Sequence, residues 1–150
     1  MTPAASPVPA PPLPDPTPLT QPFWDALRDH VIRIQYSPSA DRYVFYPRAV
    51  TPGTLRDDLE WREISGAATL YTYAVTHRPT APPWADSVPQ ILAVLEWAEG
   101  PRFTTCLVDA DPAELSVGQA MEPVFVDYDD EDVTLLFYRP GWVKPDDAWA

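Results

Sequence analysis

The chain has one cysteine, Cys106, among its 150 residues. A single thiol excludes an internal disulfide and any metal site built from several cysteines. No apolar run approaches the roughly 20 residues that a membrane-spanning helix requires. The N-terminus has no basic region followed by an apolar stretch, so we expect no secretory signal and a cytoplasmic protein without a membrane partner. The length allows one domain with a substantial core, or two small lobes.

Basic residues are scarce in the second half of the chain. The net charge is −12, and residues 79–150 hold three basic residues against fourteen acidic ones. Proteins that bind nucleic acid neutralise phosphates with clustered Lys and Arg, so the acidic half makes a nucleic-acid-binding OB module improbable. The acidic run at 127–132 lacks the glycine and terminal glutamate of an EF-hand loop. It therefore predicts a solvated hairpin turn and not a calcium site.

Proline dominates the N-terminal segment. Residues 1–21 form a Pro-Ala-Thr-Ser tail that has too few apolar groups and backbone donors for regular structure, so we expect it to be disordered. A helix then begins near Pro22 and places Phe23, Trp24 and Leu27 on one face. Because such a short helix is marginal alone, its Phe-Trp pair must dock on another part of the protein or on a partner.

Four positions have the spacing of a zinc ribbon that has lost its ligands. They are Ser37, Ala40, Thr51 and Thr54, and they flank an aromatic β segment at 43–46. Cysteine at these positions would give C-x2-C and C-P-x-C, the spacing of a four-thiolate zinc site. Alanine and neutral hydroxyl groups do not replace thiolates as zinc ligands. We therefore expect a degenerate, metal-free ribbon that binds no zinc.

The remainder of the chain has a β pattern. Alternating apolar and polar residues predict five or six strands, which are interrupted by a proline-rich loop that carries Trp84. We expect a mainly β protein in which a five- or six-stranded OB-fold barrel follows the helix and ribbon, with an SH3-like barrel as the competing architecture. The expected units are a tail (1–21), the helix and degenerate ribbon lobe (22–58), the OB domain (59–140) and an irregular tail (141–150).

The order of these features resembles a known family. The features are the Pro-Phe-Trp-x-x-Leu27 helix, the two ribbon turns, the Tyr43-Val-Phe-Tyr-Pro-Arg48 core, the Trp61-Arg-Glu-Ile-Ser-Gly66 strand and the Tyr73-Ala-Val-Thr-His-Arg-Pro79 strand. The segments at 91–103 and 117–125 continue the match. Over about residues 20–140 the chain resembles the zinc-ribbon plus OB-fold proteins associated with acyl-CoA metabolism, domain of unknown function thirty-five.

The resemblance implies a role in a complex. Members of that family accompany thiolase-fold enzymes, acyltransferases or MaoC-like hydratases, and the partner carries the nucleophile. This chain would then be a non-catalytic accessory subunit of a hetero-oligomer with a thiolase- or aldolase-superfamily partner. It would help to form the acyl-CoA channel, with acyl-CoA as the shared substrate and no tightly bound cofactor. The alternative is a stand-alone protein that binds acyl-CoA or a small apolar ligand.

Several residues are candidates for these contacts. For the partner interface or channel they are Phe23, Trp24, Tyr46, His77 and Trp84. For the CoA phosphates they are Arg42, Arg48 and Arg78, because guanidinium groups pair well with phosphate. No residue is expected to be catalytic, since Cys106 lies in a β segment where a buried, inert thiol is the commoner role. Six tryptophans and seven tyrosines exceed what one small barrel can bury, which favours a partner.

Overall fold

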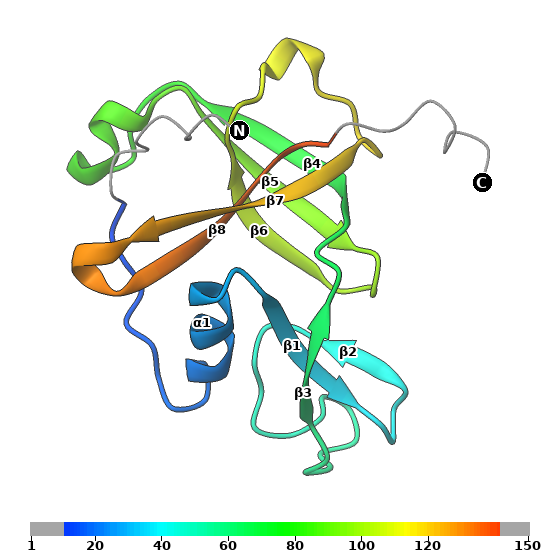
Figure 1. Cartoon of the computed structure of the whole chain (residues 1–150). Helices are drawn as coiled ribbons and strands as arrows, with labels where there is room; N and C mark the ends of the chain where they lie inside the picture. The colour runs from blue at the N-terminus through cyan, green and yellow to red at the C-terminus, as the bar shows by residue number, and fades with distance from the viewer. Residues whose placement is uncertain (1–10, 142–150) are drawn as a thin grey trace.

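The computed structural model describes residues 11–141, which form one α-helix, a small sheet and a five-stranded barrel (Figure 1). Helix α1 spans Gln21–Arg28. The ribbon sheet contains β1 (Ile32–Ser37), β2 (Arg42–Val44) and β3 (Glu60–Ile64) in the antiparallel order β2-β1-β3. The barrel contains β4 (Ala68–Thr76), β5 (Gln90–Trp97), β6 (Arg102–Leu107), β7 (Ala120–Tyr128) and β8 (Val133–Pro140). Three short 3-10 helices lie in the connections: η1 (Pro82–Ser87), η2 (Pro112–Glu114) and η3 (Asp129–Glu131).

The barrel closes in the order β4-β5-β6-β8-β7. All neighbouring strands are antiparallel except β6 and β8, which run parallel and share the single registered pair Leu107–Tyr138. A closed five-stranded barrel with this crossover is an OB-fold. The mainly β architecture with an N-terminal helix and an OB barrel is therefore confirmed, and the SH3-like alternative does not apply. No α-helix in residues 11–141 is long and apolar enough to cross a membrane.

The unit boundaries differ from the expected ones at two places. We expected the barrel to begin at residue 59, but β3 pairs along its length with β1 in the ribbon sheet, and the barrel begins with β4. Residues 11–20, which we expected to be disordered, instead take a defined path without helix or strand, with Pro11 buried. A turn at Thr17–Thr20, in which Thr17 N–H donates to Thr20 Oγ1 (2.9 Å), leads into α1. The tails at 1–10 and 142–150 lie outside the described residues.

The barrel core is centred on Trp97 and Tyr138, which are 1% and 0% exposed. Trp97 Nε1–H donates to the Tyr138 hydroxyl (2.9 Å), and that hydroxyl donates to the backbone oxygen of Gly66 (2.8 Å). Burial raises the pKa of Tyr138, so its hydroxyl keeps the proton that it donates. A buried polar chain of this kind is stable because each donor has an acceptor. It ties two barrel strands to the segment that connects β3 with β4.

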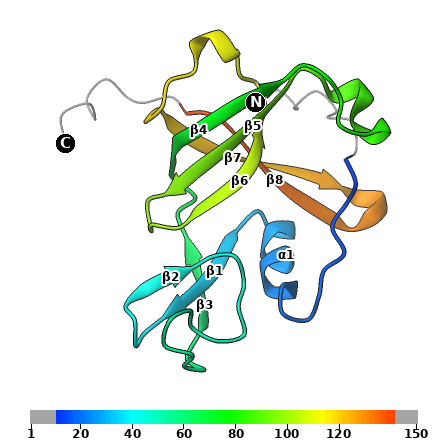
Figure 2. The same ribbon diagram turned by 180° about the vertical axis from the view of Figure 1, so that it is seen from behind.

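Helix α1 lies beside the ribbon sheet and beneath the barrel in both views (Figures 1 and 2). Its buried side chains are Phe23, Ala26 and Leu27, and Pro22 occupies the first turn, where a missing N–H costs nothing. This helix is too short to be stable alone, so its contacts with the barrel and the ribbon sheet hold it in place.

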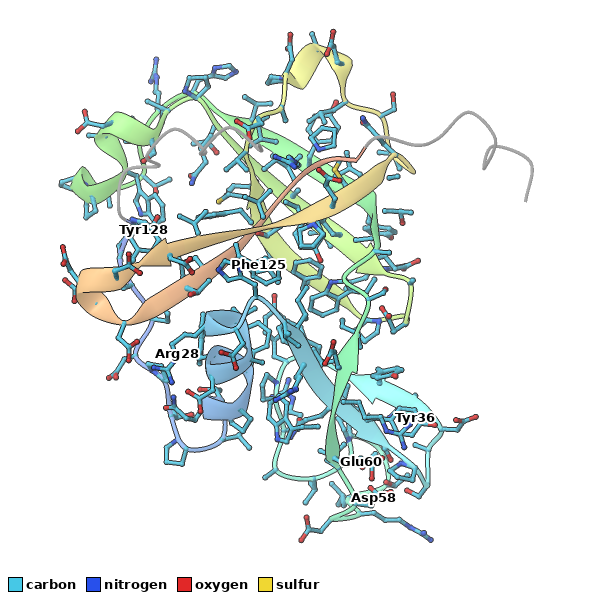
Figure 3. All side chains as sticks on the ribbon, in the orientation of Figure 1. Arg28, Tyr36, Asp58, Glu60, Phe125 and Tyr128 are labelled. Carbon is cyan, nitrogen blue, oxygen red and sulfur yellow. The ribbon has the colours of Figure 1, made fainter. Side chains whose placement is uncertain are left out.

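The C-terminal end of α1 is joined to the β7–β8 hairpin by polar contacts. Arg28 forms an ion pair with Asp132 (2.5 Å), and His30 Nε2 lies 2.9 Å from Asp127 Oδ2. The His30 ring also stacks on Phe125, with 5.0 Å between centroids. Figure 3 shows Arg28 on the helix beneath this hairpin, with Phe125 above it on the barrel. These contacts fix the helix against a hairpin that lies about 100 residues away in the sequence.

Gly66 provides the first prediction. Its φ of +79° favours glycine, and an added Cβ would lie 3.0 Å from Ile32 Cδ1 and 3.3 Å from Pro123 Cγ. Gly66→Ala should lower the free energy of unfolding by about 2–4 kcal/mol, from backbone strain plus overpacking. Gly118→Ala is the control, because Gly118 has φ +89° with open space around its Cα and should lose only about 1–2 kcal/mol. Urea unfolding measures both variants. Equal losses of unfolding free energy in the two would show that the close packing at Gly66 contributes nothing.

Asp127 provides a second prediction, on pH dependence. Hydrogen bonds from Thr134 Oγ1 (2.7 Å) and His30 hold the pKa of Asp127 below its ordinary value. A carboxyl whose folded pKa is lowered stabilises the fold above its unfolded pKa of about 3.9, and this stabilisation is lost as the pH falls through the folded pKa. Because the side chain is 43% exposed, Asp127→Asn should cost at most about 1 kcal/mol at pH 7.

The same variant should also flatten the loss of stability below about pH 4. Urea unfolding measured across pH checks both effects. Asp130→Asn is the control, because it neutralises an exposed carboxylate of the same hairpin. Its stability should vary with pH as that of the native chain does. A D127N curve that is parallel to the native one at every pH would contradict the prediction.

Candidate functional site

An apolar groove of about 400 Å³ lies where the helix, the ribbon lobe and the barrel meet. We call it the junction groove. Its walls come from α1, from the loop after β2, and from β6 and β8. The lining residues are Thr20, Phe23, Trp24, Leu27, Phe45–Pro47, Phe103–Cys106 and Leu135–Phe137. None of them carries a charge, which suits an apolar or uncharged occupant.

The groove follows from the topology of the barrel. Strands β6 and β8 share one registered pair, Leu107–Tyr138, and have no further registered pairs along their lengths. One side-chain hydroxyl joins the ribbon loop to β6, and another joins β6 to β8. Tyr46 accepts a hydrogen bond from Thr104 N–H (3.1 Å), and Thr105 Oγ1 donates to the Leu136 backbone oxygen (2.8 Å). The ribbon loop therefore reaches the barrel at its least paired place.

A series of aromatic contacts connects the three walls. Phe45 lies 5.4 Å from Phe23 on the helix and 5.0 Å from Trp97 in the barrel, measured between ring centroids. Trp97 stacks on Phe103 at 3.9 Å. Aromatic pairs at these separations add stability beyond the area they bury. The loop that carries Phe45 is thus fixed between the helix and the barrel core, and Tyr46 beside it remains 49% exposed at the groove.

The predicted channel residues divide into two groups. Phe23, Trp24 and Tyr46 come together in the junction groove, although they come from separate elements. His77 and Trp84 do not join them. His77 follows β4 and is exposed, and Trp84 lies in η1, at the end of the barrel away from the ribbon sheet (Figure 1). The partner contacts expected of these five residues would therefore form two separate surfaces.

The predicted phosphate-binding arginines are also spread out. Arg42 lies on β2, where its guanidinium donates to the Pro52 backbone oxygen. Arg48 lies in the ribbon loop, where its backbone N–H and C=O pair with the Gln35 side chain (2.7 and 2.9 Å). Arg78 is exposed in the loop before η1. Arg42 and Arg48 belong to the ribbon lobe, whereas Arg78 follows β4 of the barrel, so the three side chains do not form one joint phosphate site.

Two of the four positions with zinc-ribbon spacing contact a carboxylate, Asp58, that the sequence analysis did not single out. Ser37 and Thr51 are fully buried, Ala40 is half-buried, and Thr54 is exposed. Asp58 points between the two turns and accepts hydrogen bonds from both buried hydroxyl groups. In the sequence Asp58 resembles an ordinary turn residue. Its one signal is that it closely follows Thr51 and Thr54, the second pair of positions with zinc-ribbon spacing.

The His, Cys and carboxylate side chains of residues 11–141 do not gather into one site. No group of three or more His, Cys, Asp or Glu side chains could hold a metal ion there. Cys106 Sγ accepts a hydrogen bond from Gln90 Nε2 (3.2 Å), and burial raises the pKa of its thiol. A raised pKa disfavours the thiolate that a nucleophile needs. His30 contacts Asp127 and not the thiol.

Comparisons with known proteins give relatives of two kinds. The chain is 31% identical over 111 residues to the 3-oxo-4,17-pregnadiene-20-carboxyl-CoA hydratase alpha subunit of Mycobacterium tuberculosis, which covers 72% of this chain and 34% of that protein. It is 36% identical over 84 residues to a DUF35 domain-containing scaffold protein of Methanothermobacter thermautotrophicus, which covers 55% of this chain and 62% of that protein. The chain thus spans about a third of the hydratase subunit and less than two thirds of the scaffold protein.

Family and structural matches agree with these relatives. Residues 61–126 match the family described as "ChsH2, C-terminal OB-fold domain". The structure is similar to a chain of the solved "Ltp2-ChsH2(DUF35) aldolase", with a TM-score of 0.74 and 25% sequence identity. That likeness covers 85% of this chain and 98% of the other. In its ordered motifs, its OB barrel and these matches, the chain is similar to the DUF35 family of OB-fold proteins.

Proposed function

We propose that this chain is a non-catalytic accessory subunit of an acyl-CoA-processing complex with a thiolase- or aldolase-superfamily partner. The observation that carries the proposal is the likeness, over nearly the whole of the other chain, to a DUF35 chain of an aldolase that also contains Ltp2. The name of the mycobacterial relative, a subunit of an acyl-CoA hydratase, points to the same class of substrate.

The junction groove supports this role. It is lined by apolar and aromatic side chains, and part of that surface is open to solvent, including half of Tyr46. Tryptophan and tyrosine at a partly exposed apolar groove are typical anchors of protein interfaces. We propose that the partner covers this groove, and that the covered space forms one wall of the channel for the uncharged acyl end of the substrate.

The charge distribution supports a division of the substrate between the two subunits. The chain carries a net charge of −12, and its three candidate arginines lie on different parts of the fold. Acidic surfaces repel the CoA phosphates, whereas an uncharged groove accepts acyl groups. In our proposal the partner holds the phosphates and this chain borders the acyl end.

A second candidate function is stand-alone binding of acyl-CoA or a small apolar ligand. The observation that favours it is the volume of the junction groove, about 400 Å³, which falls in the range of small-molecule sites. The two candidates differ in one property: an accessory subunit needs a partner protein, and a stand-alone binder does not.

The test is affinity purification of the tagged chain from its native cells, with mass spectrometry of the eluate. We expect a thiolase-fold protein in near-equal amount. Trp24→Ala should reduce its recovery by about tenfold or more, because truncating a central aromatic anchor typically costs 2 kcal/mol or more. Trp24→Phe, which keeps an aromatic ring in the groove, should restore part of the recovery.

Trp84→Ala is the matched control, because it removes the same side chain from a loop outside the groove. It should leave recovery unchanged. If Trp84→Ala abolishes recovery and Trp24→Ala does not, the partner binds at the loop and the groove assignment is wrong. Recovery of the chain alone with bound acyl-CoA would favour the stand-alone binder.

A further inference from the structure

The Asp58 carboxylate lies between the two turns that carry the zinc-ribbon spacing and contacts both of them. Thr51 Oγ1–H donates to Asp58 Oδ1 (2.5 Å), and Ser37 Oγ lies 3.2 Å from Oδ2. Ser39 contributes its backbone N–H to Oδ2 (3.0 Å). The donors come from both turns, and Figure 3 shows Asp58 at the base of the ribbon sheet. We call this group the Asp58 cluster.

The cluster does not fit a zinc ion. Zinc in a structural site needs four ligands, usually thiolates or imidazoles, whereas the two buried side chains here are neutral hydroxyl groups. The Thr51 hydroxyl proton is already directed at a carboxylate, and Thr54 is exposed. Ser37 Oγ also accepts a hydrogen bond from Ala40 N–H (3.2 Å), so it is engaged as an acceptor as well as a donor.

We propose that the Asp58 cluster replaces the zinc site with its electrostatic opposite: an anion surrounded by hydrogen-bond donors in place of a cation surrounded by anionic ligands. It performs the same structural task, which is to hold the two turns of the ribbon together. The ribbon lobe of this chain is then stable without metal. This inference concerns the lobe itself and does not depend on the proposed function.

The electrostatics of Asp58 agree with this arrangement. Hydrogen bonds from Ser39 and Thr51, with a further one from Ser37, hold the pKa of Asp58 far below its ordinary value. The carboxylate is therefore fully charged at neutral pH. A charged acceptor makes stronger hydrogen bonds than a neutral one, and Ser37 and Thr51, both 0% exposed, have no water available as a substitute.

The cluster has a consequence for the junction groove. The turns that it joins flank the segment from β2 to Thr51, which carries Phe45 and Tyr46 into the groove. A second contact supports the same segment, because the Gln35 side chain pairs with both backbone groups of Arg48. Loss of the cluster should therefore loosen one wall of the groove while the barrel stays intact.

Hydrogen exchange on the full chain tests the proposal, with Asp58→Asn and Thr51→Val as the variants. Asp58→Asn replaces one acceptor oxygen with a donor, and Thr51→Val removes one donor at nearly constant volume. Both should reduce the protection of the β1 and β2 amides by about tenfold or more, with barrel amides unchanged as the internal reference. The double variant should lose little more than either single variant, because the two groups share one interaction.

Asp57→Asn is the matched control, since Asp57 is the exposed neighbour of Asp58. This variant should leave the hydrogen-exchange protection of the β1 and β2 amides unchanged. Zinc binding is tested on the native chain, purified from zinc-supplemented medium. We expect less than about 0.1 equivalent of zinc and no change in ribbon protection on adding a chelator. Near-stoichiometric zinc, protection lost on chelation, or native protection in both Asp58→Asn and Thr51→Val would each overturn the proposal.

Discussion

The aromatic contact of Phe45 with Phe23 and Trp97 is the interaction on which the rest of the structure depends. An eight-residue helix and a three-stranded sheet are each too small to be stable alone. Both become stable by packing on the barrel core, and Phe45 is the side chain that touches the helix and the core together. Each aromatic pair adds about 0.5–1.5 kcal/mol beyond burial, a large fraction of what such small elements need.

The junction groove is a direct result of this packing. The barrel has one parallel neighbour pair, β6 and β8, and these strands share a single registered contact. The ribbon loop brings Tyr46 to this seam and α1 brings Trp24 beside it, so three elements surround an uncharged hollow. In the function that we propose, this surface at the seam of the barrel would border the partner's substrate channel.

In our proposal, the ribbon lobe keeps the shape of a zinc ribbon without the metal. The zinc-ribbon spacing is still readable in the sequence, yet the two buried ligand positions hold hydroxyl groups that point at Asp58. An anion with converging donors and a cation with converging anions both draw two turns together. The difference is that the first needs only residues of the chain, whereas the second needs an ion from solution.

The sequence by itself determined the element types and the resemblance to a family. Period-two alternation indicated the strands, the Pro22 to Leu27 spacing indicated the helix, and the ordered motifs indicated DUF35. Only the tertiary structure decided that β3 pairs with β1, that Asp58 joins the ribbon turns, and that Trp24 and Tyr46 share a groove which excludes Trp84. The physical reason is that periodicity reports which face of an element is buried, but not what covers that face. The contacts of His30 with Asp127, and of Tyr46 with Thr104, exist only once the barrel has closed.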